Sequence, residues 1–165
     1  MEDSSMTGGA TDLFNAVAIA CGHDLKVSEF NDRLTLQKGC YILNSWGYGP
    51  KYSFNMYIRG PYSSDLAGEY YKYSVITGGK TDVPEDALSK LSEIYSRGIG
   101  YAEAYATVLM IRTNSKGASS EDVLKRAMDL KPCLKAEVAE AAACLLGEVR
   151  RFLLCHSDNR QGRHS

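Results

Sequence analysis

Residues 33–66 read RLTLQKGCYILNSWGYGPKYSFNMYIRGPYSSDL, and this stretch decides the fold of the whole chain. It begins with helical periodicity, passes through a turn rich in Gly and Pro, and continues as alternating apolar and polar residues. A Gly-Pro turn and a helix start follow. The order predicts helix, turn, strand, turn and helix. The stretch also holds the single Trp of the chain and has no acidic residue before Asp65.

Residues 33–46 predict an amphipathic helix. At about 100° per residue, the apolar side chains gather on one arc and the polar side chains on the opposite arc. We therefore expect one face in the core and one polar, partly aromatic face turned away from it. The apolar arc comprises Leu36, Gly39, Cys40, Ile42, Leu43 and Trp46, and the polar arc comprises Gln37, Lys38, Tyr41, Asn44 and Ser45.

Residues 52–58 give the clearest strand pattern, a regular alternation between two faces. Gly60-Pro61 should end this strand, and Ser63 or Ser64 can cap the helix that follows. A shorter strand at residues 74–77 is expected to pair with it as a small β-ribbon, since a lone strand leaves its backbone groups unpaired. One face of the alternation comprises Tyr52, Phe54, Met56 and Ile58.

The rest of the chain predicts further helices. Thr11 can begin the first of them and Gly22 can end it, while Ser119 with Asp122 three residues later forms a start that is similar to a capping box. The segment at residues 101–112 has an apolar composition that indicates a buried helix. The predicted helices outside the central stretch lie at residues 11–21, 84–97, 101–112, 121–130 and 135–154.

Together these elements predict a mainly α fold with six to seven helices and one small two-stranded β element. Their order excludes a doubly wound sheet and permits a winged-helix-like fold among other small α-rich folds. A length of 165 residues fits one domain, which we place at residues 11–156. The polar ends, residues 1–10 and 157–165, are expected to be disordered.

Charge and cysteine content limit the classes of function. A formal net charge of −1 provides no general attraction to nucleic acid or to a membrane surface. Five cysteines without a C-x-x-C pair favour reduced thiols that pack as small hydrophobic residues in the cytoplasm. The first ten residues have no secretory signal, and no apolar run is long enough to span a membrane. We therefore expect a cytoplasmic protein that does not bind membranes.

No set of residues predicts catalysis. The three histidines lack the spacing of metal ligands. Cys40 is close to Lys38 in the sequence, but it lies on the apolar arc, where a buried and unreactive thiol is expected. The glycines at residues 47–49 and 78–79 fit turns better than a phosphate-binding loop. We expect no catalytic residue, no metal and no cofactor.

One basic and aromatic patch remains as a candidate surface. Arg33, Lys38, Lys51 and Arg59 lie among seven aromatic residues of the central stretch. Such interleaving can contact phosphates and stack on bases. It also suits a protein interface, where Tyr, Trp and Arg are enriched. A third interpretation is that the aromatic residues pack in the core and the cations are solvated, and the residues alone leave all three open.

The central stretch resembles a known family pattern. The pattern is an L-Q-K-x-x-Y helix followed by a strand that ends in Y-G-P-Y/F-S-x-x-L, and it is typical of the YwgA-like proteins and of the related Panacea (SocA-like) domain. The resemblance covers about residues 12–76. The chain departs from it at Gly39-Cys40, where bulkier aliphatic residues are usual, and at Arg59. The matching residues are Leu36-Gln37-Lys38, Tyr41, Tyr57, Gly60-Pro61-Tyr62-Ser63 and Asp65-Leu66.

The resemblance implies a non-catalytic interaction domain, because Panacea domains act as antitoxins or proteolytic adaptors that bind a toxin or deliver a protein to a protease. We expect an unknown protein partner, bound by the polar helix face and residues 57–63. The alternative is a winged-helix-like nucleic-acid-binding regulator. A competing interpretation for Gln37 and Lys38 is structural, through hydrogen bonds to the turn at residues 60–65. The candidate residues for either role are Gln37, Lys38, Tyr41, Tyr57, Arg59, Tyr62, Ser63 and Asp65.

Overall fold

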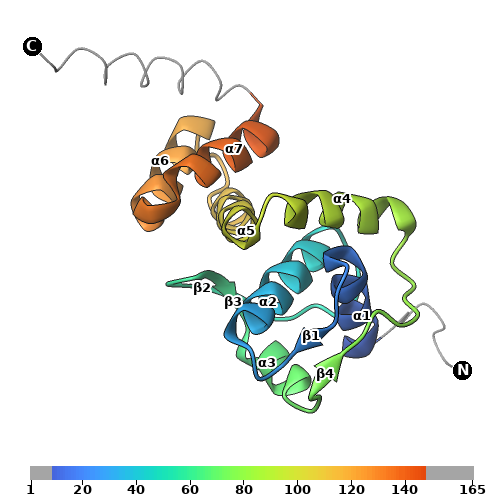
Figure 1. The fold of residues 1–165 in the computed structure, drawn as a ribbon. Helices are drawn as coiled ribbons and strands as arrows, with labels where there is room; N and C mark the ends of the chain where they lie inside the picture. The colour runs from blue at the N-terminus through green and yellow to red at the C-terminus, as the bar shows by residue number, and fades with distance from the viewer. Residues whose placement is uncertain (1–8, 148–165) are drawn as a thin grey trace, which may run out of the picture.

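The computed structural model describes residues 9–147 as seven α-helices, one short 3-10 helix and two antiparallel sheets of two strands each (Figure 1). The mainly α fold with a small β component is therefore confirmed, with two sheets in place of one. The elements are α1 (Ala10–Cys21), β1 (Leu25–Lys26), α2 (Phe30–Ser45), β2 (Asn55–Tyr57), β3 (Gly60–Tyr62), α3 (Ser64–Tyr70), β4 (Val75–Ile76), α4 (Glu85–Ser96), α5 (Ile99–Asn114), α6 (Ser120–Leu130), the 3-10 helix η1 (Pro132–Leu134) and α7 (Lys135–Leu146).

Two predictions about the ends concern residues outside this description. These are the disorder of residues 1–8 and 157–165, and the continuation of the last helix to residue 154. At the edge of the described part, α1 already begins at Ala10 with Gly9 before it. The prediction that Thr11 caps this helix is therefore wrong. The Thr11 hydroxyl instead lies 2.6 Å from the hydroxyl of Tyr73.

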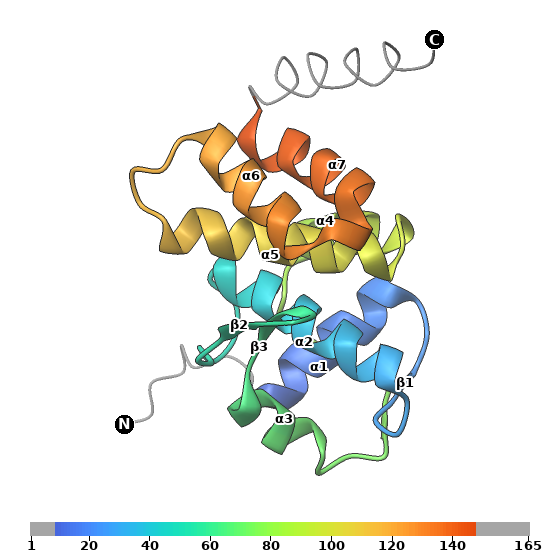
Figure 2. The ribbon, with the colours of Figure 1, turned by 90° about the vertical axis from the view of Figure 1, so that its left-hand side faces the viewer.

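Helix α5 is the centre of the fold. Every residue from Tyr101 to Ile111 is buried, as the apolar composition predicts. The helix packs against α6 and α7 on one side and against α2 and α4 on the other (Figure 2). Because it is surrounded, α5 needs no polar face. Its single acidic residue, Glu103, is consequently buried.

Helix α2 is also enclosed, so the prediction of one exposed polar face is wrong. Residues 34–43 are all buried, including Gln37 and Lys38. The helix contacts α1, α4 and α5, and also strand β3. Gly39 packs tightly against side chains of α1 and α4, because a Cβ there would overlap the Tyr95 hydroxyl and lie 2.7 Å from Val17. This close packing leaves no room for a side chain at residue 39.

Three helix ends follow signals that are local in the sequence. Gly22 ends α1 in the left-handed conformation, with φ of 78°. The Ser63 hydroxyl caps α3 by accepting a hydrogen bond from Leu66 N, and the Ser119 hydroxyl caps α6 by accepting one from Asp122 N. These caps agree with the predictions, because each depends on residues only a few positions apart.

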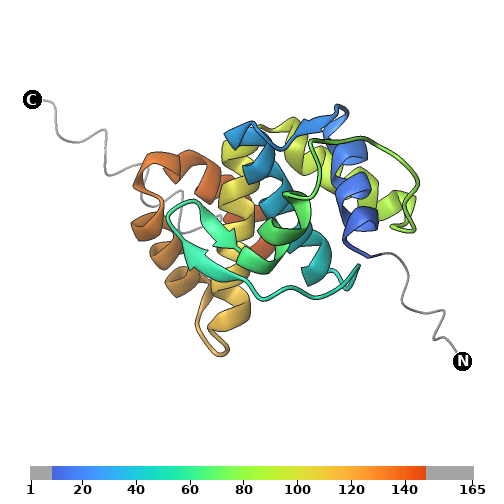
Figure 3. The same cartoon turned by 90° about the horizontal axis from the view of Figure 1, so that it is seen from below.

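The strands pair differently from the prediction. β2 pairs with β3, which starts at the Gly60 that was expected to end the strand, and the two form a hairpin with Ile58-Arg59 as its turn. β4 forms as predicted but pairs with β1, through Leu25 and Ile76. Gly60 permits the hairpin because its φ is 91°, a value that L side chains rarely adopt. Figure 3 shows the hairpin on the side of the molecule away from α1.

The packing of the cysteines agrees only in part with the prediction. Cys40 is fully buried in α2, and burial raises the pKa of its thiol well above its usual range. Burial, together with the nearby Asp32, raises the pKa of Cys21 to about 12. Cys133 and Cys144 are instead exposed, so they do not pack as small hydrophobic residues. Cys155 lies outside the described residues.

Candidate functional site

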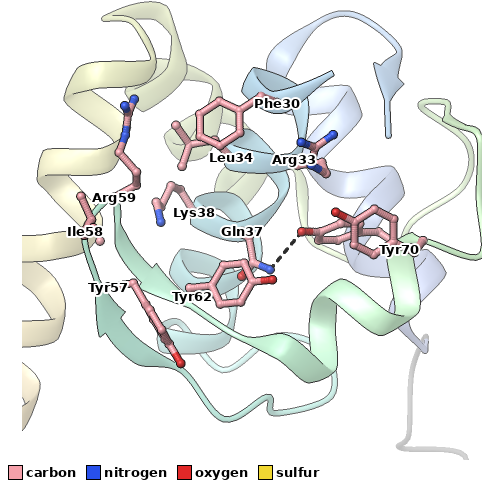
Figure 4. A pocket seen from close by; sticks show the side chains of 12 residues that line it. Phe30, Arg33, Leu34, Gln37, Lys38, Tyr57, Ile58, Arg59, Tyr62 and Tyr70 are labelled. Atoms are coloured by element: carbon pink, nitrogen blue, oxygen red, sulfur yellow. Dashed lines mark hydrogen bonds between the residues drawn. The ribbon is translucent and has the colours of Figure 1, made fainter. Parts of the chain in front are cut away.

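A pocket of about 380 Å³ opens between α2, the β2–β3 hairpin and the region of α3 (Figure 4). Side chains from residues far apart in the chain meet here, because the hairpin folds back over α2. The pocket is lined by Phe30, Arg33, Leu34, Gln37, Lys38, Tyr57, Ile58, Arg59, Gly60, Tyr62, Tyr70 and Tyr71.

Exposed apolar side chains gather at the rim of this pocket. Eight large apolar side chains are exposed within residues 9–147, and four of them line the pocket: Phe30, Tyr57, Ile58 and Tyr71. Ile58 is the most exposed of the eight, at 91%, and it occupies the turn of the hairpin. Contiguous apolar surface of this kind marks interaction sites in soluble proteins.

The amide of Gln37 holds the chain at the base of the pocket. Its Nε2 donates to the carbonyl of Ser63 and its Oε1 accepts from the N–H of Ser63, both at 2.9 Å. Nε2 also lies 3.3 Å from the hydroxyl of Tyr70, the contact drawn in Figure 4. The structural role that was considered for Gln37 is therefore present. The amide fixes the segment between the hairpin and α3.

Lys38 lies in the wall of the pocket, among Phe30, Arg59 and Tyr62 (Figure 4). The residue is 1% exposed, and its Nζ donates to the carbonyl of Pro61 at 2.6 Å. Burial lowers the pKa of Lys38 to about 7, with Lys131 and Arg59 acting in the same direction and Glu103 opposing them. Lys38 therefore also has the structural hydrogen bond to the turn that was considered for it.

Glu103 on α5 is a carboxylate that two cations, Arg59 and Lys131, share. Its Oε1 accepts a hydrogen bond of 2.7 Å from Lys131 Nζ, and its Oε2 accepts one of 3.2 Å from Arg59 Nε. Lys131 also donates to the carbonyl of Ile58. Glu103 and Lys131 are both buried, whereas about half of the Arg59 side chain is exposed. The cluster thus connects α5, the hairpin turn and the end of α6.

Two arginines flank an aromatic ring at the rim. The guanidinium carbons of Arg33 and Arg59 lie 5.8 and 5.7 Å from the centre of the Phe30 ring. These separations fit cation–π contact. Arg33 is further held by a 2.8 Å hydrogen bond to the carbonyl of Val27. The rim therefore presents a flat aromatic surface with positive charge on both sides.

The structure brings most of the predicted site residues together, but not all of them. Gln37, Lys38, Tyr57, Arg59 and Tyr62 line the same pocket. The three other predicted residues lie elsewhere: Ser63 is buried beneath the pocket as a cap, Asp65 is exposed in the first turn of α3, and Tyr41 packs against Phe54 with ring centres 5.1 Å apart.

Several residues of the site were not predicted. Phe30 was missed because the predicted helix began only at residue 33, and Ile58 because it was assigned to the strand rather than to an exposed turn. Tyr71 was not among the candidate residues. Glu103 and Lys131 were missed because neither lies in the central stretch. A signal for Glu103 existed, since a carboxylate within the apolar segment of residues 101–111 requires a buried partner.

The arrangement is suited to binding. Within residues 9–147, no three His, Cys, Asp or Glu side chains gather as metal ligands would. The cations and the exposed apolar side chains that line the pocket offer contacts to a bound group. No helix within the described part of the chain has the length and apolar character needed to cross a membrane.

Comparison of this chain with family models, with curated proteins and with solved structures gives no match.

Proposed function

We propose that this protein is a non-catalytic, cytoplasmic protein-interaction domain that takes a segment of a partner protein into the pocket between α2 and the hairpin. The observation that carries the proposal is the gathering of four exposed apolar side chains around this one pocket. A role of the antitoxin or adaptor kind, in which binding itself is the activity, agrees with the resemblance to the Panacea domain.

The hairpin turn exposes the apolar side chain of Ile58 to solvent, and contacts within the protein fix its backbone. Lys131 donates to the carbonyl of Ile58, and Gly60 packs where a Cβ would lie 2.9 Å from the Thr107 hydroxyl. The first feature holds the turn against the end of α6, and the second brings it close to α5. Since the backbone is fixed before binding, a partner that covers Ile58 loses little conformational freedom in ordering it. A rigid, exposed apolar side chain beside a pocket is typical of an interface anchor.

The nucleic-acid alternative has less support from the geometry. Lys131 is buried and bonded to Glu103, and the other cations here, Arg33, Lys38 and Arg59, line one pocket rather than the extended track that a nucleic-acid backbone needs. Helix α2, which precedes the hairpin, is enclosed and has no free face to enter a groove. Binding to duplex or single-stranded nucleic acid at low salt, falling steeply as salt is added, would favour this alternative instead.

Selection from a random peptide display library against the purified protein tests the proposed function. We expect selected peptides to bind the wild type, and we expect Ile58→Ser to weaken their binding at least about tenfold, the loss typical of an interface anchor. Fluorescence anisotropy of the labelled peptides measures the change. Ile58 is a suitable position because its side chain is exposed, so its replacement leaves the core intact.

Val75→Ser is the matched control, because Val75, in strand β4, is also an exposed branched apolar residue but does not line the pocket. It should bind the selected peptides as the wild type does. Equal affinities of the Ile58 and Val75 variants would contradict the proposed function.

A further inference from the structure

We propose that the pocket selects a carboxylate, and that its occupant is a partner segment in which an Asp or Glu side chain stands beside an aromatic or branched apolar residue. This inference rests on the proposed function and specifies the chemistry of the partner. It follows from the charges, the donors and the ring surfaces of the pocket, which agree with one another.

The charge around the pocket is unbalanced. Arg33, Lys38 and Arg59 line it, and among the described residues no Asp or Glu does. Glu103 lies behind the wall, where it is shared by Arg59 and Lys131 and also acts on Lys38. A second carboxylate, entering from the pocket, would offset part of this excess of positive charge. A lysine or arginine of a partner would instead be repelled.

The pocket also has hydrogen-bond donors to spare. An ammonium has three N–H groups, and Lys38 uses one for the carbonyl of Pro61. Arg59 holds Glu103 through Nε, and its two terminal nitrogens make no hydrogen bond to residues 9–147. Both groups stand in the wall of one pocket, and Lys38 is 1% exposed. A charge-assisted bond to a buried group is stronger than one made in water.

Aromatic rings beside the cations indicate which residue should accompany the carboxylate in the partner segment. Phe30 lies between two guanidinium groups, and Tyr57 and Tyr62 meet edge to face with ring centres 5.4 Å apart. These rings and Ile58 offer apolar contact next to the cations. A volume of about 380 Å³ suits a few side chains rather than a length of nucleic acid, which needs cations along a track.

The test begins with the peptides from the display selection. Each is synthesised with blocked ends, and again with every Asp replaced by Asn and every Glu by Gln, and both forms are titrated against the protein. We expect the amide form to bind at least about tenfold more weakly, as for loss of a charge-assisted hydrogen bond. A short oligothymidylate, which carries phosphates without a carboxylate, should compete poorly for the pocket.

The variant Arg59→Gln tests whether the peptide carboxylate binds in this pocket. The variant should weaken binding of the acidic form at least about tenfold and leave binding of the amide form nearly unchanged. Glu103 keeps its bond to Lys131, so the core of the cluster remains. Arg97→Gln is the matched control, because Arg97 is 48% exposed against 52% for Arg59, pairs with a carboxylate and lies over a tyrosine ring, but does not line the pocket.

The outcomes separate this inference from the proposed function. If acidic and amide peptides bind equally while Ile58→Ser still weakens both, carboxylate selection is wrong and the interaction domain stands. If the selection returns no peptide that depends on Ile58, both are wrong. Stronger competition by the oligothymidylate than by the acidic peptides would assign the cations to phosphate.

Discussion

Lys38 shows how one residue can reverse its expected setting. In a helix considered alone, a lysine on the polar arc points to water. Here the hairpin covers that arc, so the lysine is buried and burial lowers its pKa to about 7. The sequence could not predict this, because Pro61 and Glu103, which surround Lys38, come from elements that the helical pattern does not include.

The depressed pKa makes stability depend on pH. The unfolded chain holds this proton up to a pKa near 10.4, whereas the folded protein releases it near pH 7. Between these values the unfolded state binds more protons, so stability rises with pH. The destabilisation by the buried charge is therefore complete below pH 7 and disappears as the pH approaches about 10.

We predict that the free energy of unfolding of the wild type, compared with Lys38→Met, increases by up to about 1.4 kcal/mol for each pH unit between 7 and 10. Urea denaturation of both proteins at several pH values measures the difference. Comparison with the variant removes the contribution of other groups that titrate alike in both proteins. Parallel pH profiles would show that the Lys38 amine keeps an ordinary pKa.

At the scale of elements, the side-chain amide of Gln37 makes the pair of backbone hydrogen bonds that a neighbouring strand would make. It donates to and accepts from the same backbone unit, that of Ser63, as a neighbouring strand would. The hairpin and α3 are thereby fixed to α2 at the point where the chain changes direction. A three-residue strand has few ladder bonds of its own, so the hairpin depends on this outside support.

We predict that Gln37→Leu lowers the free energy of unfolding by roughly 2–6 kcal/mol, since it leaves the buried N–H and C=O of Ser63 without partners, at about 1–3 kcal/mol each. Urea denaturation measures the loss. Asn15→Leu is the control, because its exposed amide makes one hydrogen bond, to the carbonyl of Lys80. A loss in Gln37→Leu no greater than in the control would contradict the role given to the amide.

Elements differ in how far the sequence determines them. The ends of helices at Gly22, Ser63 and Ser119 were predictable, because a cap depends on a few adjacent residues. The strand at residues 75–76 was predictable from its composition, but its partner was not. β4 pairs with β1, which is far from it in the sequence. This pairing depends on the packing of α1 and α2, which places Leu25 opposite Ile76.

At the scale of the whole molecule, Glu103 joins the two halves of the fold. It reaches Arg59 in the hairpin, which belongs to the first half, and Lys131 at the end of α6, which belongs to the second. The candidate pocket could be predicted in part from the central stretch. The cluster that supports it could not be predicted, since its residues Glu103 and Lys131 come from α5 and the end of α6 and neither residue belongs to a local sequence motif.

We predict that Glu103→Gln lowers the free energy of unfolding by about 3–5 kcal/mol, because it leaves Lys131 buried without its carboxylate. Glu140→Gln removes the exposed pair with Arg97 and should cost no more than about 1 kcal/mol. Chemical denaturation compares the two variants. Amide hydrogen exchange should also show faster opening of the hairpin in Glu103→Gln, and equal stability of both variants would contradict the prediction.

The hydrogen bond between Lys131 and Ile58 also affects the order in which parts of the protein fold during translation. These residues are 73 positions apart, so a nascent chain carries the hairpin and Glu103 well before Lys131 is translated. Domains that emerge from the ribosome fold from the N-terminal side first. The hairpin turn thus reaches its final position only after α6 has been made. The contacts that hold the hairpin turn are therefore complete only after residue 131 has been translated.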